Sequence, residues 1–196
     1  MNKESIKDFF DNLASSWDDD MVRNEEVIKI ILDNASITSG KDVLDVACGT
    51  GVLIEDYLKR DVNRITAIDL SSEMIKVAKS KFNDDRVKFI CGDILEFNDN
   101  EKYDSIMVYN AFPHFCDGEA LIRHLSSLLK ENGTLSIAHG MSRDKINKHH
   151  SGSASSVSNN LISAKELSDI FSKYLTVKDV ISNDLMYQVM GVNKTL

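Results

Sequence analysis

Three carboxylates and a glycine loop carry the clearest chemistry in this sequence. In the stretch VLDVACGTGVL, an apolar run that contains Asp45 leads into a loop with Gly49 and Gly51. Glycine lets the backbone approach a ligand closely, because it has no side chain to stand in the way. Asp69 follows Gly49 by twenty residues, and Asp93 closes a further apolar run. Carboxylates at these places can accept hydrogen bonds from hydroxyl and amino groups of a nucleoside.

Two familiar phosphate ligands fit this loop poorly. A P-loop needs the pattern G-x-x-x-x-G-K-[ST], whereas Asp42 stands in the hydroxyl position after Gly40 and Lys41, and no glycine lies five residues before Gly40. A dinucleotide fingerprint needs a third small residue for close helix packing, and that position holds Ile54. The carboxylate of Asp45 would also oppose a pyrophosphate. The loop therefore favours an adenosine ligand without phosphate and with a positive charge.

S-adenosylmethionine has these properties, and the acids suit its parts. Asp45 suits the ammonium end, through water, and Asp69 can accept both ribose hydroxyls from the end of its strand. Asp93 can accept the adenine amino group. Met74 and Ile94 are apolar neighbours of these acids and suit the two faces of the purine. An isolated acid or glycine would indicate only turn chemistry, so the prediction depends on their order along the chain.

Four of the five histidines follow the fourth and fifth expected strands, so we place them on the ligand side. One hypothesis is that His139 with His149 or His150 binds a divalent metal, since imidazole is a common metal ligand. The other is that they are polar lining and part of a solvated loop. Adjacent histidines rarely point at one centre, and no cysteine or carboxylate is spaced to complete the set. A metal is possible but not favoured.

S-adenosylmethionine carries an activated methyl group, and the segment NAFPHF, after the fourth strand, is where we expect the molecule that would accept it. His114 is placed to face the transferring methyl and is the candidate catalytic base for an acceptor that must lose a proton. The alternative is a buried, hydrogen-bonded structural histidine. Phe115 could form a wall of the acceptor pocket, with simple core packing as the alternative. His139, His149 and His150 complete the candidate substrate residues.

Alternating helical and strand patterns must position these residues. Strands that alternate with helices predict a parallel sheet covered on both faces. Two final strands separated by a short turn can pair only as an antiparallel hairpin. The strands are expected at 42–47, 64–70, 86–93, 103–110, 134–140, 175–182 and 185–193, and the helices at 4–16, 22–35, 52–60, 72–82, 118–130 and 163–173.

Five segments follow one another along the chain in the order LDVACGTG, ITAIDLSSEMI, VKFICGDILEF, YDSIMVYNAFPHF and LLKENGTLSIAHG. In these segments the chain resembles the class I, Rossmann-like S-adenosylmethionine-dependent methyltransferases. The resemblance covers roughly residues 5–140. It implies a three-layer α/β fold with a mostly parallel seven-stranded sheet and one antiparallel strand. FFDNLASSWDDD resembles the lid helix of the small-molecule branch, in which an aromatic such as Trp17 covers the methionine end. Ala47 stands for the first loop glycine, Leu70 follows the ribose acid, and Asn110 matches the position near the methionine amino group.

Length, charge and cysteine content constrain the domain organisation, the partners and the location of the protein. We expect a single domain over residues 1–196, with residues 1–21 as an N-terminal lid helix and residues 140–162 as a long polar loop on the substrate side. The net charge of −8, without a basic cluster, disfavours nucleic acid. Three scattered cysteines and no apolar leader or membrane-length run predict a cytoplasmic protein.

We therefore predict methyl transfer from S-adenosylmethionine to a small-molecule acceptor, with no membrane partner. The alternatives are a non-catalytic protein that binds or senses S-adenosylmethionine, and a methyltransferase that acts on a protein or RNA. The sequence does not identify the acceptor or the oligomeric state.

Overall fold

A single seven-stranded sheet forms the centre of the protein. The computed structural model describes residues 2–19, 21–150 and 156–193. The strand order is β3-β2-β1-β4-β5-β7-β6. Among the described strands β7 runs against its two neighbours, and the other adjacent pairs are parallel, as predicted. The strands are β1 (Asp42–Val46), β2 (Arg64–Asp69), β3 (Val87–Cys91), β4 (Tyr103–Tyr109), β5 (Leu129–His139), β6 (Leu175–Ser182) and β7 (Tyr187–Asn193).

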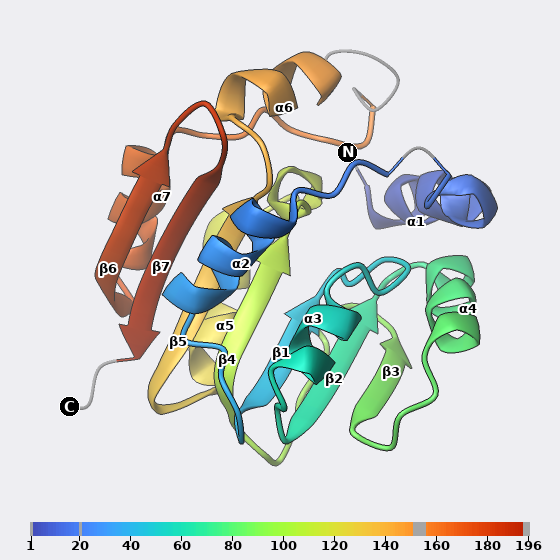
Figure 1. Cartoon of the computed structure of the whole chain (residues 1–196). Helices are drawn as coiled ribbons and strands as arrows, with labels where there is room; N and C mark the ends of the chain where they lie inside the picture. Colours follow the sequence, from blue (N-terminus) through green and yellow to red (C-terminus); the bar gives the residue numbers. More distant parts are fainter. Residues whose placement is uncertain (1, 20, 151–155, 194–196) are drawn as a thin grey trace.

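Helices cover both faces of this sheet (Figure 1). Several begin at a polar residue whose side chain accepts a hydrogen bond from the first turn; these caps are Asn2, Asn24, Ser71, Asp117 and Ser163. The helices are α1 (Lys3–Leu13), α2 (Glu25–Asn34), α3 (Ile54–Lys59), α4 (Ser72–Lys81), α5 (Gly118–Ser127), α6 (Arg143–His150) and α7 (Ala164–Phe171), with short 3₁₀ turns η1 (Ala14–Ser16) and η2 (Phe112–His114). No helix in the described ranges has the length and hydropathy that a membrane span needs.

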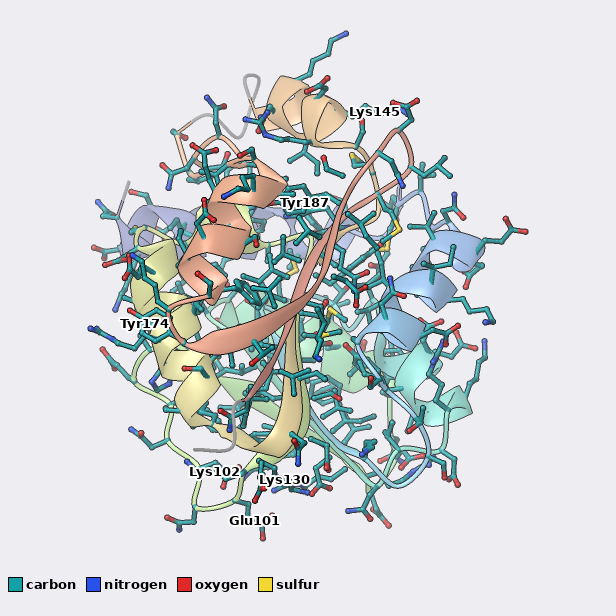
Figure 2. The ribbon with its side chains drawn as sticks, turned by 90° about the vertical axis from the view of Figure 1, so that its left-hand side faces the viewer. Glu101, Lys102, Lys130, Lys145, Tyr174 and Tyr187 are labelled. Carbon is teal, nitrogen blue, oxygen red and sulfur yellow. The ribbon has the colours of Figure 1, made fainter. Side chains whose placement is uncertain are left out.

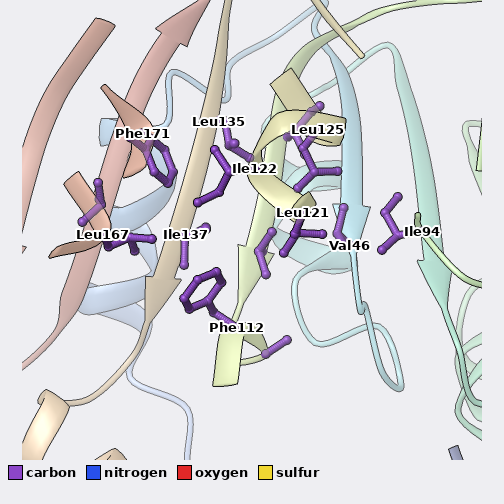
Figure 3. Packing of buried hydrophobic residues seen from close by; sticks show 14 of the residues in the cluster. Val46, Ile94, Phe112, Leu121, Ile122, Leu125, Leu135, Ile137, Leu167 and Phe171 are labelled. Carbon is purple, nitrogen blue, oxygen red and sulfur yellow. The ribbon is translucent and has the colours of Figure 1, made fainter. Parts of the chain in front are cut away.

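The core lies on the two faces of the sheet, because successive strand side chains point in opposite directions. In β4, Ile106 and Val108 belong to the cluster under α5 and α7, whereas Met107 and Tyr109 belong to the cluster under α2 and α3. Figure 3 shows the first cluster, in which leucines of α5 and the side chains of α7 meet the sheet. Packing on both faces fixes the orientation of each strand, and with it the direction of every residue at its end.

The carboxyl ends of the parallel strands share one edge, and this edge carries the glycine loop after β1 and the loops after β2, β3 and β4. β1, β2, β4 and β5 all point toward it, with α1 and α6 lying beyond it (Figure 1). In the side view, Lys145 of α6 lies at the opposite end of the molecule from Glu101 and Lys130 (Figure 2). The sheet thus gathers segments from distant parts of the chain at one place.

The expected loop over residues 140–162 contains a helix, α6, which corrects that prediction. Its sequence is polar apart from Ile146, so it has no helical periodicity to detect. Tertiary contacts hold it: Ile146 is buried, and the Asn147 side chain exchanges hydrogen bonds with the backbone of Leu161.

Two further boundaries differ from expectation. The helix expected over residues 118–130 ends at Ser127, and β5 already begins at Leu129. The Asn132-Gly133 pair, a sequence typical of a helix end, therefore lies within β5 near a register shift, and Asn132 has φ +60°. The expected N-terminal helix 4–16 is α1 followed by η1, so regular helix covers only part of residues 1–21.

Candidate functional site

A cavity of about 590 Å³ opens at the carboxyl edge of the sheet. It is lined by residues from the loops after β1, β2, β3, β4 and β5, together with the N-terminal segment. The structure brings together twelve of the predicted site residues in its lining: Trp17, Ala47, Gly49, Asp69, Leu70, Met74, Asp93, Ile94, Asn110, His114, Phe115 and His139.

The two glycines of the β1 loop have different roles. Gly49 lines the cavity with φ +55°, and a Cβ added there would meet no atom within 4 Å. Gly51 lies outside the lining, and a Cβ there would come within 2.9 Å of the Phe82 ring. Gly49 therefore leaves backbone surface open to a ligand, while Gly51 allows the loop to pack against the protein.

Asp69 ends β2 and fastens the glycine loop to the start of α4. Its two carboxylate oxygens accept hydrogen bonds from the backbone N–H groups of Gly49 and Ser71, both at 2.8 Å. Burial raises the pKa of Asp69, while these two bonds act in the opposite direction. Each carboxylate oxygen retains a second acceptor site, so the group can still receive the two hydroxyls of a ribose.

Asp93 lies on the far side of the cavity, after β3. Its Oδ1 accepts the Leu95 N–H at 2.9 Å, and its Oδ2 forms an ion pair with Lys3 of α1. The hydrogen bond to Asp93 raises the pKa of Lys3. Nearby, the buried side chains of Ile94 and Met74 give the cavity two apolar surfaces suited to a flat heterocycle.

Asp45 does not line the cavity. It points from β1 into the protein and is 2% exposed. Burial raises its pKa to about 8, and the charge of Asp69 acts in the same direction. The carboxyl group is therefore mostly protonated at neutral pH, which weakens the expected attraction for an ammonium group. A contact between Asp45 and a ligand stays a prediction.

The N-terminal segment closes over the cavity and is held by carboxylates. Asp11 of α1 accepts hydrogen bonds from the Ser71 hydroxyl at 2.5 Å and from the Glu73 N–H at 3.2 Å. Asp18 accepts the Thr50 hydroxyl at 2.6 Å and pairs with Lys81. These contacts connect the N-terminal segment to the glycine loop and to α4.

Aromatic rings cover the part of the cavity near η2. The ring of Phe10 packs edge-on against His114, with 4.9 Å between centroids, and against Trp17 at 5.6 Å. The His114 Nδ1 lies 2.9 Å from the backbone oxygen of Val157. The structure thus places the candidate base His114 in contact with the N-terminal segment.

The end of β5 contributes the remaining polar wall. His139 is 2% exposed, and its ring meets Tyr187 edge-on at 5.9 Å. Asn110, with φ +54°, accepts the Gly140 N–H at 3.0 Å, so its amide shapes the turn between the two strand ends. Gly140 leaves space for the Tyr109 side chain, because a Cβ at residue 140 would lie 2.3 Å from the tyrosine hydroxyl.

Sequence reasoning missed many residues of the lining, among them Phe10, Arg23 and Tyr109. Phe10 lies within the expected helix 4–16 and Tyr109 within the expected strand 103–110, so neither residue stood out as a site residue. Arg23 had no recognisable signal, because its partners Asp56 and Val52 lie about thirty residues away in sequence. Its hydrogen bond to Glu25 and its contacts with Asp56 raise the pKa of Arg23, so it stays charged at the cavity wall.

The proposed metal ligands are not assembled by the residues described. No group of three or more His, Cys, Asp or Glu side chains in the described part of the chain is placed to hold a metal ion. His139 lines the cavity, whereas the side chains of His149 and His150 lie outside what the structure describes. Their predicted roles in metal or substrate binding stay predictions.

Comparison with known proteins agrees with this geometry. Residues 43–133 match the model of a family described as a methyltransferase domain. The chain is 33% identical over 141 residues to a malonyl-[acyl-carrier protein] O-methyltransferase of Acetivibrio thermocellus, covering 70% of this chain and 50% of that protein. The enzyme of the same name from Priestia megaterium is 34% identical over 139 residues, covering 69% and 51%. The chain spans about half the length of these relatives.

Solved structures share the fold at lower identity. A putative methyltransferase in complex with the Trm112 methyltransferase activator of Haloferax volcanii aligns with TM-score 0.81 and 20% identity, covering 95% of this chain and 98% of that one. Magnesium protoporphyrin IX methyltransferase from Synechocystis with bound S-adenosylhomocysteine aligns with TM-score 0.75 and 17% identity, covering 98% and 100%. The loop after β1, the acids after β2 and β3 and these matches show that the chain belongs to the class I, Rossmann-like S-adenosylmethionine-dependent methyltransferases.

Proposed function

We propose that this protein transfers a methyl group from S-adenosylmethionine to a small-molecule acceptor enclosed beneath the N-terminal segment. The observation that carries the proposal is that one cavity joins two sets of residues. Gly49, Asp69 and Asp93 form the nucleoside side, while Phe10 and His114 form a covered apolar and basic side. A site of this kind suits a small ligand better than a folded macromolecule.

The nucleoside side fits S-adenosylmethionine residue by residue. Asp69 would accept the ribose hydroxyls, and Asp93 the adenine amino group. Gly49 leaves room for the methionine part, with Arg23 as a cationic partner for its carboxylate. When bound, S-adenosylmethionine supplies a methyl group already activated by the sulfonium charge.

The covered side of the cavity, with Phe10 and His114, is called here the acceptor side, and it has three tasks. The rings of Phe10 and Trp17 exclude water, and the walls hold the acceptor nucleophile in line with the methyl group, which is where most of the rate gain arises. His114 takes the proton when the nucleophile is a hydroxyl, amine or thiol. A carboxylate acceptor carries no proton on its nucleophilic oxygen, so it would not need this base.

A carrier-bound carboxylate is the second candidate acceptor. The names of the two relatives above favour it, since both act on a malonyl group attached to an acyl-carrier protein. The two candidates differ in their dependence on His114. His114→Gln should lower transfer to a protonated nucleophile by about 100-fold and leave transfer to a carboxylate nearly unchanged.

The acceptor class can be tested with methyl-labelled S-adenosylmethionine. The protein is incubated separately with small metabolites, with macromolecules from the same extract, and with a malonyl-loaded carrier protein. Each incubation is repeated with a Trm112-type activator, because the structural neighbour forms a complex with one. We expect label in the metabolite fraction. Label confined to protein or RNA would contradict the small-molecule proposal.

The non-catalytic alternative is tested on the same samples. Calorimetry with S-adenosylmethionine and S-adenosylhomocysteine measures binding without any acceptor. Binding of both, with no label transferred in any incubation, would favour a sensing protein. Absence of binding at millimolar concentration would contradict the cofactor assignment itself.

A further inference from the structure

We propose that residues 157–161, called here the strap, position His114 for proton transfer and that Asn159 is the positioning residue. The inference rests on the proposed function of His114 and extends it to a segment outside the cavity. The strap follows α6 in sequence, and none of its residues lines the cavity. It nevertheless contacts η2, which carries His114, through two hydrogen bonds, and the following residue Phe115 through a third.

The first contact determines which ring nitrogen carries the proton. His114 Nδ1 lies 2.9 Å from the Val157 carbonyl oxygen. A carbonyl oxygen can only accept a hydrogen bond, so Nδ1 must be the protonated nitrogen. In neutral His114 the basic lone pair is then on Nε2. A general base needs its lone pair on a defined nitrogen, and an imidazole without this partner can adopt either tautomer.

Asn159 holds the strap against the residues on either side of His114. Its backbone N–H donates to the Pro113 carbonyl at 2.8 Å, and its side-chain amide donates to the Phe115 carbonyl at 3.2 Å. The Asn159 side chain is exposed and makes no contribution to the apolar core. Its position is therefore explained by the backbone of η2 that it bonds.

The other end of the strap is anchored to α6. The Leu161 N–H donates to Asn147 Oδ1 at 2.7 Å, and the Leu161 carbonyl accepts from Arg143 Nε at 2.8 Å. The side chains of Val157 and Leu161 are buried at 2% and 0% exposure. The strap is thus fixed at both ends, which gives the Val157 carbonyl a defined place.

Within the described part of the chain, the strap and α1 both contact the ring of His114. The strap bonds its Nδ1, and Phe10 of the lid packs edge-on against its ring. A histidine that only filled the core would need neither a particular tautomer nor an exposed asparagine beside it. The arrangement sets both the orientation and the proton position of the proposed base.

The tautomer can be read directly by nitrogen-15 NMR of the imidazole side chains, with His114→Gln used to assign the signals. In the full chain we expect His114 to be protonated at Nδ1 in its neutral form. Asn159→Ala should convert this signal to a mixture of both tautomers. Asn159→Asp, which keeps the shape but loses the amide donor, should do the same. The neighbouring exposed Asn160→Ala is the matched control and should leave the signal unchanged.

Binding and turnover separate this inference from the function on which it rests. Asn159→Ala should keep the affinity for S-adenosylhomocysteine within about twofold and lower kcat for a protonated acceptor by about tenfold. Wild-type His114 protonated at Nε2, or an unchanged tautomer in both Asn159 variants, would overturn the inference. If the wild-type protein did not bind S-adenosylhomocysteine, that result would instead contradict the proposed function.

Discussion

The nucleoside side and the acceptor side of the cavity are built in different ways. Gly49 and Asp93 lie in the loops after β1 and β3, and Asp69 ends β2, so all three come from neighbouring parallel strands that follow one another in the sequence. On the acceptor side, Phe10, His114 and the strap that contains Val157 come from widely separated segments. The first arrangement depends on the sheet alone, whereas the second depends on how helices and loops pack above it.

Among the substitutions that distinguish the two sides, the largest effect is expected at Asp69. Asp69→Ala should weaken binding of S-adenosylhomocysteine by about 100-fold, because it removes a carboxylate acceptor and leaves two partly buried backbone N–H groups without their partner. Calorimetry measures the change. The exposed Asp85→Ala is the control, while His114→Gln should change the same affinity by about twofold at most. An equal loss in the Asp69 and His114 variants would remove the distinction between the two sides.

The two loop glycines provide the next test. Gly51→Ala should lower the free energy of unfolding by about 2 kcal/mol, because φ is +86° and the new Cβ would press on Phe82. At Gly49 the new Cβ would meet open space, so Gly49→Ala should lower the free energy of unfolding by about 1 kcal/mol. It should weaken cofactor binding more than Gly51→Ala does. Denaturant unfolding and calorimetry on both variants measure the two effects. The assignment of ligand approach to Gly49 and of packing to Gly51 would be wrong if Gly51→Ala impaired cofactor binding without lowering the free energy of unfolding.

Asp45 makes a prediction about pH. The folded protein keeps the proton on this buried carboxyl up to about pH 8, whereas the unfolded chain releases it near pH 4, at about the ordinary pKa. Between these values the folded state binds the extra proton, so the free energy of unfolding falls as pH rises, by at most about 1.4 kcal/mol per pH unit.

Asp45→Asn removes this titration. We expect the variant to gain stability relative to wild type as pH rises from 5 to 8, by about 1 kcal/mol per unit. Thermal unfolding of both proteins across this range measures the difference. A constant difference at all pH values would mean that Asp45 is already ionised in the folded protein.

The smallest effect is expected where the lid meets the nucleoside side. Lys3 pairs with Asp93, but its side chain is 56% exposed, so the pair is weak. Because the adenine amino group would use the same carboxylate, Lys3→Ala should tighten S-adenosylhomocysteine binding by about twofold at low salt and by less at high salt. Lys29→Ala, which removes an ion pair of α2, is the control. Weaker binding in the Lys3 variant would show that this residue assists the ligand.

Much of the fold was accessible from local patterns. The strands are short apolar runs, the helix starts carry polar caps, and the final hairpin required one reversed strand. The helix α6 was missed because Ile146 is its lone buried apolar side chain among those described, so no periodicity marks it. The end of α5 was misplaced because the Asn132-Gly133 pair, typical of a helix stop, lies within β5 instead.

The sequence by itself determined the family, the sheet and the meeting of Gly49, Asp69 and Asp93 in one cavity, because the ends of parallel strands meet at one edge whatever covers the faces of the sheet. It could not show that Asp45 is turned away from the cavity, nor that Arg23 and Tyr109 line it. Tertiary structure alone decided these, and it also placed the Val157 carbonyl against His114. Contacts between residues far apart in the chain depend on the packing of whole elements, which no local pattern encodes.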